Sequence, residues 1–320
     1  MDDKLKETLT LYNLKSPKAD MLRHNENATY KVVDGGKDYV LRIHQPTEGF
    51  SLGMLHTNFV KYDLIHNEIQ IINDLADSAD ILLQRPMLNC EGDTVSVLSC
   101  GTPATLLEWI QGETLEQANM TSELFFTIGE TVAKMHRHWS VCKQKYARFS
   151  YDQSLLPCVS EAIRDAATCS IITKQQEQTI HEAIAEIRRR FDELDQTGLT
   201  KHIVHADLYK QNIVQNKGIV TPIDFSLCGY SHFYLDIAAI LSHSEDDNDR
   251  QSLLAGYKSI RNLEINPYFI EPYYVLETLL FYAHHYKRAH EWDWWSETVE
   301  SECEEEFKPL AAKERFLKNP

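Results

Sequence analysis

The sequence lacks the features that define several large protein classes. No stretch of its 320 residues comes near the roughly 18 consecutive apolar residues that a membrane-spanning helix needs. The N-terminal segment MDDKLKETLT is polar and unlike a secretory signal. The seven cysteines are scattered without a C-x-x-C pair, which argues against zinc and favours free thiols in a reducing compartment. We therefore expect a cytoplasmic protein without a membrane partner.

Basic residues are also scarce. The chain has 32 Lys and Arg against 48 Asp and Glu, which gives a formal net charge of −16. Nucleic-acid binding is disfavoured, because a phosphate backbone requires a basic surface. An acidic surface could attract a cationic small molecule, although ordinary solubility explains the same charge.

The first third of the chain is predicted to form a small β-rich lobe. Residues 29–43 contain two β-rich runs around an Asp-Gly-Gly turn, which is typical of a hairpin. Apolar residues at helical spacing predict an amphipathic helix over residues 61–76. Two further strands are expected at residues 94–99 and 104–108.

The remainder is predicted to be mainly helical. Helical periodicity covers residues 121–139, allows one or two helices over 160–194, and returns from Phe233 onward. The fold class is therefore α+β. We expect a small β-rich lobe joined near residues 108–112 to a larger, mainly helical lobe.

One island of short strands interrupts the helical half, HIVHADLYKQNIVQNKGIVTPIDF at residues 202–225. Turn chemistry is one explanation for its polar residues, since Asp and Asn are common in loops. A metal–phosphate site is the other. Asn212 and Asp224 would supply the oxygen ligands that Mg²⁺ prefers beside nucleotide phosphates, and Asp207 would supply a carboxylate for an acceptor hydroxyl.

Between about residues 20 and 240 the sequence resembles the aminoglycoside phosphotransferase and choline kinase group, the small-molecule branch of the protein-kinase-like fold. The resemblance is carried, in family order, by ENATYKV at 26–32, YVLRIH at 39–44, the helix with Glu68, LLEWIQGETL at 106–115, AKMH at 133–136, HADLYKQN at 205–212, IDF at 223–225 and CGYSHFYLDIA at 228–238. It implies a bilobal protein-kinase-like fold and an ATP- and Mg²⁺-dependent O-phosphotransferase, with GTP as an alternative donor. The nucleotide-binding lobe would be residues 1–107, the hinge 108–112, and the helical lobe with the catalytic loop and acceptor site 113–320.

The resemblance assigns roles around the catalytic loop. Asp207 would be the catalytic base or would orient the acceptor hydroxyl, and His205 would orient the loop by hydrogen bonding. Asn212 and Asp224 would hold Mg²⁺ against the phosphates. Asp236 would support the loop from behind, although a carboxylate at a helix N-terminus has a structural use of its own.

The resemblance also assigns residues to the nucleotide. Arg42 stands where protein kinases carry a lysine, and it would contact the phosphates and pair with Glu68. Alternatively, Arg42 could be an exposed residue of the strand, and Glu68 could lie on the solvated face of its helix. The loop at residues 25–29 would cover the triphosphate through backbone N–H groups and the side chains of Asn27 and Thr29. The Glu108 carbonyl and the Ile110 N–H would face the adenine edge.

Two positions depart from the family pattern. Ala206 stands where relatives often have Gly between the His and the Asp. Because Ala favours ordinary φ values, we expect the loop to avoid the left-handed region there. Ser226 stands where many relatives have a further acidic residue, which could alter contacts to a second metal or to the substrate.

The acceptor is predicted to be a small molecule. Only residues 225–235 lie between Asp224 and Asp236, and neither D-F-G nor A-P-E is present, so a protein-kinase activation segment has no room. Antibiotic modification and a metabolic kinase acting on homoserine, choline or a sugar both stay open. A protein Ser/Thr kinase and a non-catalytic nucleotide-binding module are the disfavoured alternatives. The sequence does not specify an oligomeric state.

The segment at residues 291–306, EWDWWSETVESECEEE, has eight acidic residues and no basic one. Its acids and tryptophans could form a cleft wall that binds a cationic acceptor through ion pairs and cation–π contacts. A solvated helix face with tryptophans packed in the core accounts for the same pattern.

Overall fold

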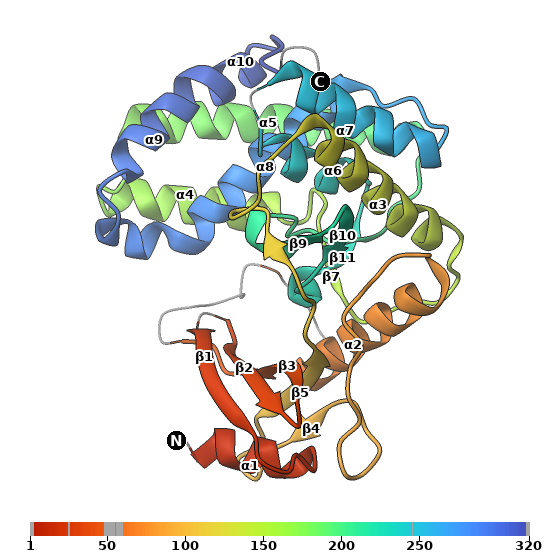
Figure 1. Cartoon of the computed structure of the whole chain (residues 1–320). Helices are drawn as coiled ribbons and strands as arrows, with labels where there is room; N and C mark the ends of the chain where they lie inside the picture. The colour runs from red at the N-terminus through yellow and green to blue at the C-terminus, as the bar shows by residue number, and fades with distance from the viewer. Residues whose placement is uncertain (1–2, 25, 48–54, 56–59, 245, 318–320) are drawn as a thin grey trace.

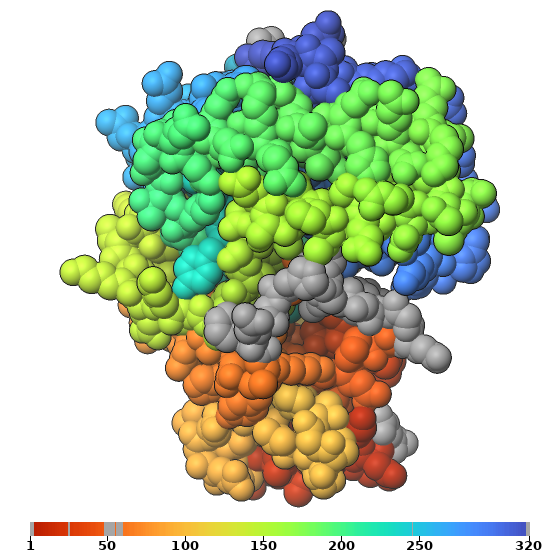
Figure 2. All heavy atoms as spheres, turned by 180° about the vertical axis from the view of Figure 1, so that it is seen from behind, coloured from red at the N-terminus to blue at the C-terminus, as the bar shows by residue number. Residues whose placement is uncertain are grey.

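The computed structural model describes residues 3–24, 26–47, 55, 60–244 and 246–317. The chain forms a small β-rich lobe and a larger helical lobe, which meet at a narrower waist (Figure 1). Seen from behind, the small lobe (red and orange) lies below the larger one (green and blue), as Figure 2 shows. The predicted α+β, bilobal architecture is confirmed.

The small lobe is built on an antiparallel sheet with the strand order β1-β2-β3-β5-β4. Its elements are α1 (Asp3–Leu11), β1 (Lys18–His24), β2 (Ala28–Asp34), β3 (Lys37–Ile43), α2 (Lys61–Ser78), β4 (Ser96–Val97) and β5 (Pro103–Glu108). The predicted hairpin is β2–β3, and Gly35 and Gly36 in its turn have φ values of 58° and 80°. Glycine adopts such values without steric cost.

The two faces of this sheet bury different helices. Adjacent residues of a strand point to opposite faces. Leu106 of β5 belongs to the apolar cluster that contains Leu5 and Leu9 of α1, whereas Leu107 belongs to the cluster that contains Ile72 of α2. The α2 cluster continues into the larger lobe, so α2 ties the sheet to the helical part of the molecule.

The larger lobe surrounds two small three-stranded sheets with helices. One sheet has the order β10-β9-β6 and the other β7-β11-β8. The elements are β6 (Glu113–Thr114), α3 (Ser122–Val141), β7 (Phe149–Ser150), α4 (Leu156–Thr168), α5 (Lys174–Gln196), β8 (His202–Val204), β9 (Ile213–Asn216), β10 (Ile219–Pro222), β11 (Gly229–Ser231), α6 (Tyr234–Leu241), α7 (Asp247–Ile260), α8 (Pro267–His285), α9 (Trp295–Glu302) and α10 (Lys308–Ala311).

Helices α3 and α7 cross at close range because each has a glycine at the contact. A Cβ on Gly129 would lie 2.1 Å from the Leu253 carbonyl oxygen, and a Cβ on Gly256 would lie 2.0 Å from the Phe126 carbonyl oxygen. Neither position has room for any other residue. Helix α3 also contacts β8, so the pair lies behind the strand that leads into residues 205–212.

Helix α6 is the centre of the larger lobe. Each of its eight residues, Tyr234 to Leu241, is buried. One of them is Asp236, so a carboxylate is fixed in the core directly behind the island of strands. None of the helices in the described ranges combines the length and the apolar character needed to cross a membrane.

The structure departs from the expected elements mainly at the N-terminus. Neither α1 nor β1 was expected, and β4 covers Ser96–Val97 rather than residues 94–99. Helix α2 ends at Ser78, two residues beyond the predicted end. The division of the chain at residues 108–112 stays a prediction.

Candidate active site

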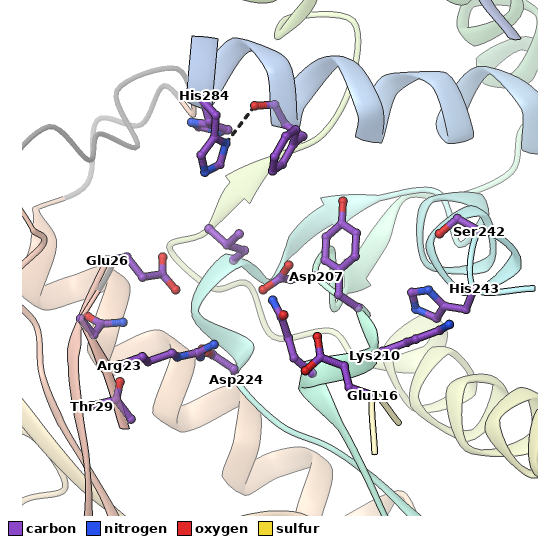
Figure 3. Close-up of a pocket in the computed structure, with 16 residues that line it drawn as sticks. Arg23, Glu26, Thr29, Glu116, Asp207, Lys210, Asp224, Ser242, His243 and His284 are labelled. Atoms are coloured by element: carbon purple, nitrogen blue, oxygen red, sulfur yellow. Dashed lines mark hydrogen bonds and ion pairs between the residues drawn. The ribbon is translucent and has the colours of Figure 1, made fainter. Parts of the chain in front are cut away.

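A cavity of about 570 Å³ lies between the lobes and receives side chains from both. The small lobe contributes Arg23, Glu26, Asn27 and Thr29, and the island of strands contributes Asp207 and Asp224 (Figure 3). Four of these residues were predicted site residues. Thr29 lies opposite Arg42 in the β2–β3 register, so both side chains leave the same face of the sheet.

Asp207 and Asn212 form the local unit at the end of β8. The short 3₁₀ turn Lys210–Asn212 brings Asn212 back beside Asp207. The Asn212 side-chain amide donates to Asp207 Oδ2 at 2.7 Å and to the Asp207 carbonyl at 3.0 Å. Burial raises the pKa of Asp207 well above its usual range, and the negative charges of Asp224 and Glu26 add to the shift.

Asp224 is a buried carboxylate between two arginines. Arg42 Nη1 lies 3.3 Å from Asp224 Oδ1, and Arg23 donates to Asp224 Oδ2. Burial favours the neutral acid, but the charges of Arg42 and Arg23 outweigh it and lower the pKa of Asp224. Asp224 has a φ of 63°, in the left-handed region that Asp tolerates better than most residues.

The donor set fits a hard divalent cation. Asn212 is 1% exposed, and its Oδ1 has no hydrogen-bond partner in the described part of the chain. The Ile223 N–H donates to the Asn212 carbonyl at 2.8 Å, which holds the residue before Asp224 against Asn212. No group of three His, Cys, Asp or Glu among the described residues is placed to hold a metal. Mg²⁺ binds through one or two protein oxygens together with phosphates and water, and Asn212 Oδ1 and the Asp224 carboxylate would supply such oxygens.

Arg42 and Glu68 are paired as predicted. Arg42 Nη2 lies 2.7 Å from Glu68 Oε1, and the two residues are only 4% and 2% exposed. The alternatives, in which Arg42 is exposed on the strand and Glu68 lies on a solvated helix face, are therefore ruled out. The additional contact from Arg42 to Asp224 links the sheet of the small lobe to the island of strands at residues 202–225.

Asp236 supports the loop from α6. Its carboxylate accepts hydrogen bonds from the backbone N–H groups of His205 and Ala206, both at 2.8 Å, and lies 2.9 Å from His136 Nε2. His205 Nε2 lies 3.1 Å from the Ile223 carbonyl, so its ring joins the loop to β10. His136 had no assigned role, although it ends the AKMH segment of the resemblance.

The expectation for Ala206 was wrong. Its φ is 60°, in the left-handed region that we expected the loop to avoid. A non-glycine residue there costs roughly 1–2 kcal/mol. The two N–H groups of His205 and Ala206 converge on one buried carboxylate, and hydrogen bonds of this charge-assisted kind offset the cost.

Replacing Ala206 by glycine should stabilise the protein by about 0.5–1 kcal/mol, because strain is removed while the unfolded chain gains some freedom. Denaturant unfolding measures the change. Ala162→Gly is the matched control in α4, where the same substitution should destabilise by about 1 kcal/mol. A loss of stability in Ala206→Gly equal to that of the control would show that the loop is unstrained.

The predicted hinge contacts are not part of this cavity. Neither Glu108 nor Ile110 lines it. The Glu108 carbonyl accepts from Gln84 Nε2 at 3.2 Å, so a nucleotide base would have to share or displace that bond. Their contact with adenine stays a prediction. In the loop at 25–29, Asn25 lies outside the described residues.

Four charged residues of the cavity, Arg23, Glu26, Glu116 and Lys210, were not identified from sequence. Arg23 comes from β1, and Glu26 from the following loop. Glu26 accepts from Ser226 Oγ at 2.6 Å, and burial together with Asp224 raises the pKa of Glu26 to about 7. The sequence signal for Glu26 was Ser226, which stands where many relatives have an acidic residue. Glu26 places a carboxylate beside Ser226.

The acidic segment at 291–306 does not line this cavity. Trp292, Trp294 and Trp295 lie behind Phe281, with ring centroids 6.0, 6.2 and 6.2 Å from the phenyl ring. Phe281 itself faces the cavity. Trp295 is buried, which favours its interpretation as support from the core, whereas Trp294 is 43% exposed and does not fit that interpretation.

Known proteins share the sequence pattern and the fold. The family model for the phosphotransferase enzyme family matches residues 22–266. An amicoumacin kinase from Bacillus subtilis (strain 168) is 23% identical over 244 residues, a match that spans 74% of this chain and 66% of that protein.

Solved structures agree with the predicted protein-kinase-like fold, which is confirmed. A microcompartment-associated aminopropanol kinase has a TM-score of 0.79 at 19% identity and covers 99% of this chain and 100% of its own. An amicoumacin kinase, hAmiN, in complex with AMP-PNP, Ca²⁺ and Ami has a TM-score of 0.71 at 19% identity, covering 98% and 94%. Because the family model matches well over half of its residues, the chain belongs to the phosphotransferase enzyme family.

Proposed function

We propose that this phosphotransferase is an ATP- and Mg²⁺-dependent small-molecule kinase that moves the γ-phosphate to an acceptor hydroxyl. The observation that carries the proposal is that Asp207 and Asp224 line the cavity between the lobes, while Asn212 is hydrogen-bonded to Asp207 and its buried Oδ1 has no partner among the described residues. A buried polar atom without a partner costs free energy, so its position has a function to account for it.

Asn212 and Asp224 would hold Mg²⁺, which would neutralise charge on the ATP phosphates. Arg23 and Arg42 already supply positive charge to Asp224 from the small lobe. The side chain of Arg23 is 40% exposed, so it is free to turn from Asp224 toward a phosphate. Arg42 is held by Glu68 and would keep its place.

Asp207 would receive the acceptor. Its carboxylate, whose pKa is raised by burial, accepts a hydrogen bond readily and would align the hydroxyl with the γ-phosphorus. As the new O–P bond forms and the bond to the β-phosphate oxygen breaks, the hydroxyl proton would pass to Asp207. His205, Ala206 and Asp236 would hold the loop in position during this step.

The acceptor class includes an aminoglycoside-like antibiotic and an amine or amino-alcohol metabolite. One of the structural relatives is a kinase of aminopropanol, an amino alcohol. ATP is the proposed donor and GTP the alternative, since the base contacts of Glu108 and Ile110 are untested. The seven cysteines are all free thiols, in keeping with the proposed cytoplasmic location.

An ATP-consumption screen with Mg²⁺ tests the proposal. We expect at least one acceptor among aminoglycosides, macrolides, choline, homoserine, sugars and amino alcohols to give ADP together with an equal amount of a new phosphomonoester, detected by ³¹P NMR. Incubation with no acceptor is the control for simple ATP hydrolysis. Strong Mg·ATP binding without turnover of any acceptor would instead support a non-catalytic nucleotide-binding module.

A further inference from the structure

A second, smaller cavity of about 130 Å³ adjoins the catalytic loop on the side of the helical lobe. Asp207 is one of six residues that line both this cavity and the larger one, so the two cavities adjoin beside the proposed catalytic carboxylate. Its polar lining includes Tyr151, Tyr209 and Glu277, and much of the remaining wall is apolar, for example Leu280 and Phe281. The small cavity is therefore placed where an acceptor would lie.

Helix α8 forms the wall opposite Asp207. Glu277, Phe281 and His285 follow each other at intervals of four residues, which puts them on one face of the helix. All three line the cavity. Figure 3 shows α8 above the catalytic loop, with His284 and Asp207 on these two facing elements. The sequence of α8 thus turns a carboxylate, a phenyl ring and an imidazole toward the acceptor space.

Glu277 is a carboxylate without a counter-charge. In the described part of the chain it has no hydrogen-bond or ion-pair partner, and no Lys or Arg lines the cavity. Burial, with the negative charges of Asp236 and Asp207, raises the pKa of Glu277 well above its usual range. Burial also lowers the pKa of His285, so this imidazole is uncharged at neutral pH. A partly buried carboxylate in such surroundings is costly unless a cation joins it.

Tyr209 lines the cavity together with the two carboxylates. Burial raises the pKa of Tyr209 well above its usual value, and the charges of Glu277 and Asp207 contribute to the shift. The phenol therefore stays protonated and neutral. The cavity combines the acidic groups of Asp207 and Glu277 with the neutral phenol of Tyr209, a combination that suits a ligand with a cationic group and a hydroxyl group.

We infer that Glu277 binds the ammonium group of the acceptor, and that the acceptor is a small primary amino alcohol whose hydroxyl lies at Asp207. The inference rests on the proposed phosphotransferase function and narrows its acceptor. A volume of about 130 Å³ corresponds to roughly four water molecules at liquid density. Pockets for drug-sized ligands are about 300–1,000 Å³. An amino alcohol of about five non-hydrogen atoms fits within this cavity alone, with Asp207 and Glu277 both in its lining.

The test compares 1-amino-2-propanol with 1,2-propanediol, which replaces the ammonium group by a hydroxyl and keeps the number of non-hydrogen atoms. The wild-type enzyme should prefer the amino alcohol in kcat/KM. Glu277→Gln should lower that preference by roughly 10- to 100-fold, the loss expected for one hydrogen bond to a charged group, mainly through KM for the amine. Glu297→Gln, at an exposed position on α9, is the matched control and should keep the preference.

Stability provides a second measurement. A carboxyl whose pKa is raised by folding destabilises the native state at every pH above its unfolded pKa of about 4.3, and most strongly above its folded pKa. Glu277→Gln should therefore unfold at the same or a higher temperature at pH 8. Lower thermal stability with an equal loss of activity on both acceptors would assign Glu277 a structural role and overturn the inference.

The two proposals fail in different ways. If the wild-type enzyme phosphorylates neutral hydroxyl compounds as well as it does amines, or if Glu277→Gln keeps the preference, the inference is wrong while the phosphotransferase proposal stands. If nothing is phosphorylated, the phosphotransferase proposal fails. Calorimetric binding of 1-amino-2-propanol then still decides the inference: binding lost in Glu277→Gln supports it, and no binding to the wild-type protein overturns it.

Discussion

Asp207→Ala is expected to reduce kcat for phosphoryl transfer by at least about 10³-fold, while the affinity for Mg·ATP changes by less than about threefold. The Asp207 carboxylate lines both cavities, so its removal takes away the contact proposed to align and deprotonate the acceptor. Asn212 should keep its orientation, because its amide also donates to the Asp207 backbone carbonyl at 3.0 Å, which alanine retains.

Single-turnover phosphoryl transfer and calorimetric ATP titration measure the two quantities separately. Asp192→Ala, at an exposed position on α5, is the control and should behave as wild type. Asp207→Asn separates the two roles, since an amide oxygen can accept a hydrogen bond from the hydroxyl but cannot take its proton. Activity of Asp207→Asn far above that of Asp207→Ala would assign orientation as the main role. Turnover at the wild-type rate in the alanine variant would remove Asp207 from the mechanism.

Local patterns in the sequence were sufficient to predict much of the fold and the island of strands at residues 202–225. The β2–β3 hairpin follows from a glycine pair between two β-rich runs, and helix α2 follows from its apolar spacing. Asp207, Asn212 and Asp224 are close in sequence, and the β9–β10 hairpin between them is short. Their convergence could therefore be predicted without knowledge of distant contacts.

Strand β1 could not be predicted in this way. Most of its residues are exposed, so it lacks the alternation that marks a half-buried strand. Yet it carries Arg23, whose partner Asp224 lies 201 positions further along the chain. Pairing over such a separation depends on how the lobes meet, and no periodicity in a single sequence records it.

The conformation of Ala206 was missed for a related reason. Local preference favours negative φ for alanine, and the expectation followed that preference. The determining group is the carboxylate of Asp236, 30 positions away on a buried helix, which binds two consecutive N–H groups of the loop. Tertiary hydrogen bonds thus overrode a local rule at a site where the loop must be held in one geometry.

Asp224→Asn is expected to weaken Mg²⁺-dependent ATP binding by at least about 100-fold, because even groups that only support a metal ligand cost 10–100-fold when removed. Asparagine is the better substitution than alanine. It tolerates the left-handed φ of 63° at this position, whereas alanine would add backbone strain. It also leaves an oxygen near Arg42 and Arg23, although without the charge that a buried pair requires.

Calorimetric titration with ATP, in Mg²⁺ and in EDTA, isolates the metal's contribution. In the wild-type protein Mg²⁺ should strengthen ATP binding, and in Asp224→Asn most of that gain should vanish. Asp38→Asn, which removes a salt bridge to Lys31 on the small lobe's sheet, is the control for a lost ion pair outside the cavity. An ATP affinity in Mg²⁺ equal to that of the wild type would contradict the metal assignment. Asp224 would then be a structural acceptor for Arg23 and Arg42, and Asn212 Oδ1 would need another partner.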